Sequence, residues 1–215
     1  MSFLNELKSK ASALQSEQSV LQSLTAANVQ ATEAAAKTAW FYIADLARQL
    51  DVIQPDGPTL NLDNKTHWPA MKLTGFRADS RKKRLNDADV FDTIALAWRI
   101  VPRNGAPVPG SVSANFPPDL ERIEKRVSAG SVQHERVNVR HPQKGTLQAI
   151  QFNYLTEAKG GVTITADHLQ AKLHFRLANA SGFSIDNTSY PASQIQSGLL
   201  DELAKLIVGQ ANRFA

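Results

Sequence analysis

The densest cluster of side chains that could bind a ligand is a basic stretch between positions 72 and 84. It holds six basic residues against one acid, Asp79, and it includes the uninterrupted run Arg81–Arg84. Phosphate binding requires clustered positive charge that can displace counterions, and a loop could present it. The pattern therefore offers an anion-binding or nucleic-acid-binding loop, whose candidate residues are Arg77, Arg81, Lys82, Lys83 and Arg84.

A simpler interpretation of the same stretch is a solvated hairpin tip. Three acids follow closely, at Asp87, Asp89 and Asp92, and they offset the charge. No aromatic residue is interleaved within the basic run, so nothing there can stack on bases. Because charge runs are usually solvated faces, we favour the hairpin tip over nucleic-acid binding.

A second candidate surface comes from strict alternation between Leu169 and Leu177. Apolar residues at the odd positions alternate with polar residues at the even ones, which predicts a half-buried strand in an antiparallel sheet open on one side. Lys172, His174 and Arg176 would point from the open face. They are candidates for a ligand-binding or enzymatic site there.

No pattern supports a catalytic centre, a metal site or a cofactor. The chain has no cysteine, its five histidines lack metal-ligand spacing, and it contains neither a nucleophile elbow nor a phosphate-binding glycine loop. No resemblance to a known family is evident. These absences favour a protein that acts by interaction rather than by catalysis.

The elements that position these residues begin with a long helix. Residues 3–52 contain no glycine or proline and are rich in good helix formers. Leu7, Leu14 and Leu21 repeat every seven residues, as in a coiled-coil seam, and are candidates for self-association.

The length of this helix leaves two alternatives. About 50 helical residues reach about 75 Å, whereas a domain of 160 residues is about 40 Å across. Either residues 1–25 project and bind a protein partner or a second copy, or the helix breaks near Ser23–Asn28 and folds back as a hairpin.

The rest of the chain predicts an α+β domain over residues 54–215, following the helical region of residues 1–53. Apolar alternation predicts about 5–7 strands in a mainly antiparallel sheet, closed by an amphipathic helix near the C-terminus. Pro102–Pro118 is predicted to be an irregular loop and Gly160–Gly161 a turn. Trp68 is expected to be partly exposed.

Composition and the lengths of the apolar runs indicate where in the cell the protein is expected. The chain has 215 residues, 42% of them hydrophobic, and a net charge of +4. Its apolar runs are shorter than the roughly 20 residues that a membrane helix needs, and its N-terminal residues lack the features of a secretory signal. We therefore expect a cytoplasmic protein with no membrane contact.

Overall fold

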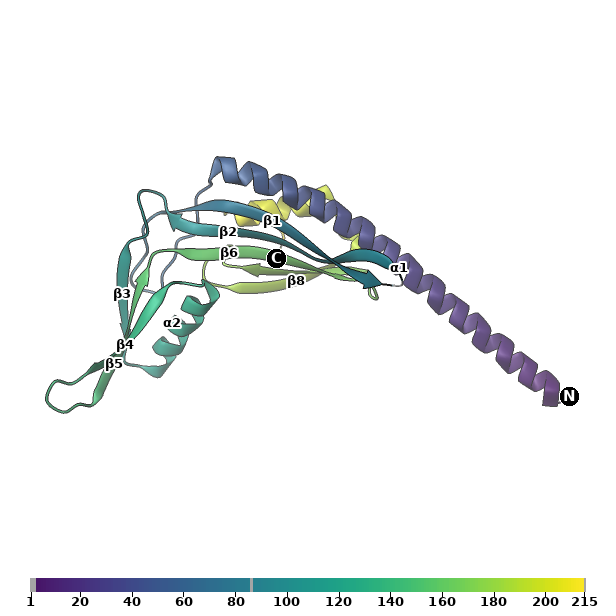
Figure 1. Cartoon of the computed structure of the whole chain (residues 1–215), viewed down its shortest axis with the longest axis horizontal. Helices are drawn as coiled ribbons and strands as arrows, with labels where there is room; N and C mark the ends of the chain where they lie inside the picture. Colours follow the sequence, from purple (N-terminus) through teal and green to yellow (C-terminus); the bar gives the residue numbers. More distant parts are fainter. Residues whose placement is uncertain (1–2, 86, 215) are drawn as a thin grey trace.

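The computed structural model describes residues 3–85 and 87–214, with side chains at positions 7, 8 and 10 and from position 23 onward. It is an α+β structure, as predicted, in which helix α1 (Phe3–Ile53) crosses one face of an antiparallel sheet (Figure 1). That sheet has five strands in the order β1-β2-β6-β7-β8. Its strands are β1 (Met71–Leu85), β2 (Ala88–Pro102), β6 (Ala158–Asp167), β7 (Lys172–Ala178) and β8 (Ile185–Pro191).

A second, three-stranded sheet has the order β3-β5-β4. It consists of β3 (Pro109–Ala114), β5 (Leu147–Leu155) and β4 (His134–Arg140), with helix α2 (Pro117–Ala129) beside it. The presence of β3 corrects the prediction that Pro102–Pro118 is irregular throughout. Its alternating buried residues, Val112 and Ala114, supply the apolar face that a strand needs.

Helix α1 is unbroken, so the helical hairpin does not form. Ala, Leu, Gln, Lys and Glu dominate its sequence, and the Ser and Thr side chains near residue 25 do not interrupt it. The helix ends where Gln54 takes a positive φ of 47° and Pro55 follows. A proline cannot continue the helix, and it disfavours helical geometry in the residue before it.

The second half of α1 packs on the sheet through one stripe. The stripe residues recur every three or four positions and are almost fully buried, as an amphipathic helix requires. They are Thr32, Ala35, Ala36, Ala39, Ile43, Ala47 and Leu50. Their neighbours are mainly β1 and β2.

Helix α3 (Ser197–Ile207) covers the same face of the sheet as α1. Leu200, Leu203 and Ile207 are buried, and the Tyr42 hydroxyl of α1 donates a 2.6 Å hydrogen bond to Asp201 Oδ1. Burial, and then this hydrogen bond, raise the pKa of Tyr42. The prediction that a C-terminal helix closes the sheet is confirmed.

Strand β7 begins later than the alternation suggested. Leu173, Phe175 and Leu177 are buried as predicted, but residues 168–171 form a turn and Leu169 is 74% exposed. The cause is Asp167, whose Oδ1 accepts the backbone N–H groups of Leu169 and Gln170 at 3.0 Å. A side chain that binds the backbone in this way offers an alternative to pairing in the sheet.

Two further expectations are corrected. Gly160 and Gly161 lie inside β6 instead of in a turn, and a Cβ on Gly160 would come within 2.3 Å of Trp98 Nε1. The glycine is needed there for close packing of Trp98.

Trp68 is buried, not partly exposed, and stacks on Tyr154 with ring centroids 5.5 Å apart.

Candidate functional site

The first half of α1, residues 3–27, forms an arm that extends away from both sheets (Figure 1). Its 25 residues span about 37 Å at the helical rise. Leu7 is 47% exposed and Leu24 is 56% exposed, so these apolar side chains have no place in the core. The side chains of Leu14 and Leu21 lie outside the described residues.

A polar anchor marks where α1 meets the turn between β6 and β7. Asn28 Nδ2 donates a 2.7 Å hydrogen bond to the carbonyl of Leu169. One turn further on, Glu33 Oε1 accepts the backbone N–H of Phe91 at 2.8 Å and lies 2.9 Å from His168 Nε2. One carboxylate thus joins α1 to β2 and to the β6–β7 turn.

The Glu33–His168 contact in this anchor is largely shielded from solvent. The His168 side chain is only 4% exposed and that of Glu33 is 28% exposed. Hydrogen bonds between poorly hydrated polar groups have strict geometry, and leaving one partner unsatisfied is costly. The anchor, together with the buried stripe of α1, holds the helix in place where the arm begins. Sequence reasoning missed Glu33 and His168. The available signal was that the buried residues fall on even positions in β6 and on odd positions in β7, which indicates an irregularity between the two strands.

The basic stretch does not form a loop. Residues 77–84 lie on β1, which pairs with β2 along its whole length, so the prediction of a basic loop is wrong. Neighbouring side chains on a strand point to opposite faces of the sheet. In addition, the pairing of β1 with β2 is irregular between Arg81 and Lys82, as at a β-bulge. The five candidate cations are therefore not presented together.

Two of the five candidate cations have an acidic partner nearby, and a third lies over an aromatic ring. Lys83 Nζ lies 3.0 Å from Asp92 Oδ1, and Arg84 Nη2 lies 3.5 Å from Asp87 Oδ1. Lys82 Nζ stands 5.2 Å from the centroid of the Phe91 ring. Arg77 and Arg81 pair with Ala97 and Thr93, which places them on the face of the sheet opposite α1.

The predicted ligand face is open, but its three candidates do not converge. Lys172 Nζ donates to Gln170 Oε1 at 3.2 Å, and His174 Nε2 lies 3.6 Å from Asp167 Oδ2. Hydrogen bonds from the backbone N–H of Gln170, then from His174 and Leu169, hold the pKa of Asp167 below its usual value. Arg176 lines a cleft on this face.

The described part of the chain contains no group of three or more His, Cys, Asp or Glu side chains suited to a metal ion. None of its helices is long and apolar enough to cross a membrane.

Comparison of the chain with protein-family models, with curated proteins and with solved structures gives no match.

Proposed function

We propose that this protein acts in assembly, and that its arm pairs with the arm of a second copy. The observation that carries the proposal is the continuation of α1 as an unbroken helix for 25 residues beyond its anchor, with leucines exposed to solvent. In water an isolated helix is only marginally stable, and most helical stability in proteins comes from packing of an apolar face. Two described apolar side chains of the arm, Leu7 and Leu24, are left exposed by the rest of the chain.

The sequence of the arm favours a second copy as the occupant. The seven-residue spacing of Leu7, Leu14 and Leu21 is self-complementary, because two identical helices can interlock the same seam. Residues 3–27 carry two acids and two bases, Glu6, Glu17, Lys8 and Lys10, so two arms do not repel each other through net charge. The anchor holds the helix in place where the arm begins, which lowers the entropy lost on pairing.

Cysteine cross-linking tests this proposal, since the natural chain has no cysteine. Leu14 is the middle one of the three heptad leucines, so Leu14→Cys meets its counterpart both in a parallel pair and in an antiparallel pair in which Leu7 faces Leu21. We expect rapid disulfide-linked dimer with Leu14→Cys. Leu7→Cys should cross-link only in a parallel pair, and so it reports orientation.

The matched control is Thr38→Cys, an exposed position on the docked half of the same helix. It should remain monomeric on denaturing gels under the same oxidising conditions. Equal cross-linking at positions 14 and 38, or none at position 14, would contradict pairing through the arm.

A further inference from the structure

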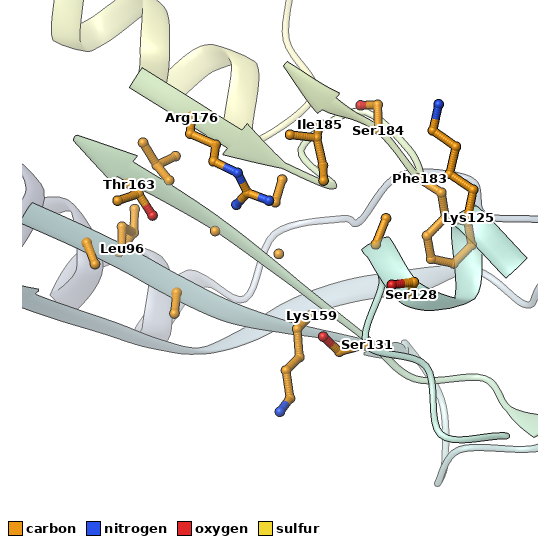
Figure 2. Close-up of a pocket in the computed structure, with 17 residues that line it drawn as sticks. Leu96, Lys125, Ser128, Ser131, Lys159, Thr163, Arg176, Phe183, Ser184 and Ile185 are labelled. Carbon is orange, nitrogen blue, oxygen red and sulfur yellow. The ribbon is translucent and has the colours of Figure 1, made fainter. Parts of the chain in front are cut away.

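We propose that a cleft on the open face of the five-stranded sheet binds a small organic anion with an apolar body. The cleft lies between this face, the C-terminal end of α2 and the segment 183–185 (Figure 2). Its volume is about 730 Å³, within the range of about 300–1,000 Å³ that small-molecule sites occupy. This proposal is independent of the pairing of the arms.

The strand register explains why the sheet is hollow here. Ala97 on β2 pairs with Gly161 on β6, and Gly161 pairs with Ala178 on β7. Directly paired residues point to the same face, so this row across three strands carries almost no side-chain volume. Neither α1 nor α3 covers this face, since both pack on the other one, and the C-terminal end of α2 borders the hollow.

The walls of the cleft are held in place by buried contacts. The fully buried Asn179 donates 2.7 Å hydrogen bonds from Nδ2 to the carbonyls of Ala129, at the end of α2, and Lys159, in β6. Phe183 packs edge-on against Trp68 at 5.4 Å and lies close to Gly130 at the end of α2, where an added Cβ would come within 2.4 Å of its ring. The cleft is therefore preformed, and binding a ligand costs little reorganisation.

The basic side chains at the edge of the cleft favour a ligand with negative charge. Arg176 from β7, Lys125 from α2 and Lys159 from β6 line the cleft from three elements, and Figure 2 shows them on different sides of it. None of the described residues that line the cleft is acidic, and none of these three cations has an ion-pair partner among the described side chains. By contrast, Arg99 on the same face is neutralised by Glu157 at 2.8 Å.

The remaining lining defines the rest of the ligand. Hydroxyl groups are contributed by Thr163, Ser128 and Ser131, which can orient a polar head group. Phe183 and the 44% exposed Ile185 add apolar surface beside them. This combination suits a carboxylate, phosphate or sulfonate attached to a ring or a short chain.

The test uses the fluorescent dye 8-anilino-1-naphthalenesulfonate, an anion with an apolar body, titrated into the full chain at low salt. We expect saturable binding that weakens as salt is added. The double variant R176Q/K159Q should weaken binding by about tenfold or more, because contacts to charged groups are the strong ones. The control K172Q, on the same face but outside the cleft, should leave the dissociation constant unchanged.

A steric variant separates the cleft from the general charge of this face. Ala97→Phe keeps every cation but fills the hollow, and it should abolish dye binding. Circular dichroism and the thermal midpoint establish that each variant is folded, and the two surface substitutions in R176Q/K159Q keep the test decisive if Ala97→Phe does not fold.

Three results would overturn the proposal. One is dye binding that R176Q/K159Q leaves unchanged. Another is dye binding that persists in folded Ala97→Phe. The third is displacement of the dye by a thymidine oligonucleotide whose own binding requires Arg77 and Arg81 but tolerates Ala97→Phe, which would identify the face as a nucleic-acid surface.

Discussion

The two halves of α1 have the same backbone conformation but different surroundings. From Asn28 to Ile53 the helix buries a stripe of alanines, Ile43 and Leu50 against the sheet. From Phe3 to residue 27 it has no sheet beside it, and Leu7 and Leu24 face solvent. A continuous helix therefore does not imply one environment: the first half leaves Leu7 and Leu24 exposed, whereas the second half is part of the core.

The largest expected effect is loss of stability when the docked half is truncated. Ile43 is fully buried between α1 and the sheet, so Ile43→Ala should lower the free energy of unfolding by about 2–5 kcal/mol. Phe41→Ala, two residues away and 60% exposed in the native chain, should change it by less than about 0.5 kcal/mol. Urea denaturation measures both values. Equal effects would mean that α1 is not docked through this stripe.

A smaller effect is expected at the anchor, which divides the two halves. Glu33→Ala removes the acceptor for the Phe91 N–H and for His168, leaving buried polar groups unsatisfied at a cost of about 1–3 kcal/mol. Hydrogen exchange should quicken in the 168–171 turn. Glu121→Ala, at an exposed glutamate of α2, serves as the control. Slow exchange retained in the turn of Glu33→Ala would show that the carboxylate does not hold it.

The smallest effect on stability is expected from titration of Asp167, at the start of the same turn. The folded-state pKa of Asp167 is lowered by its hydrogen bonds, so its contribution to stability is present above the unfolded pKa of about 3.9 and is lost as pH falls through the folded pKa. Asp167→Asn should therefore destabilise the protein at neutral pH. It should also reduce the fall in stability that the unsubstituted protein shows as the pH is lowered below about 4. Thermal midpoints between pH 2 and pH 7 measure this. A mutant curve parallel to that of the natural chain would contradict it.

Local patterns in the sequence predicted those parts of the fold that depend on neighbouring residues. The absence of glycine and proline predicted α1, and alternation predicted the buried face of β7. The loop alternative for the basic stretch was wrong because pairing with β2 extends the strand through Arg81–Arg84, whereas the favoured interpretation, a solvated hairpin tip, agrees with the exposed residues 81–84 near the end of the β1–β2 hairpin. That pairing depends on apolar residues of the partner strand, such as Val90 and Phe91, which no local pattern links to the basic side chains.

The cleft could not have been predicted from the sequence for a similar reason. Arg176 was singled out because its own strand exposes it, but Lys125 and Lys159 reach the same cleft from a helix and from another strand. Their proximity depends on the register of three strands and on the hydrogen bonds of Asn179. Such long-range geometry leaves no periodic signal along the chain.

The most direct test of the account compares the full chain with a version lacking residues 1–25, using light scattering for molar mass and heating for the unfolding midpoint. We predict that the full chain has twice the monomer mass. The shortened chain should be monomeric and should unfold at the same midpoint when both are dilute, because the α1 residues of the described core, from Ala35 to Leu50, lie in the docked half. A monomeric full chain at every concentration, or a shortened chain that remains dimeric, would contradict assembly through the arm.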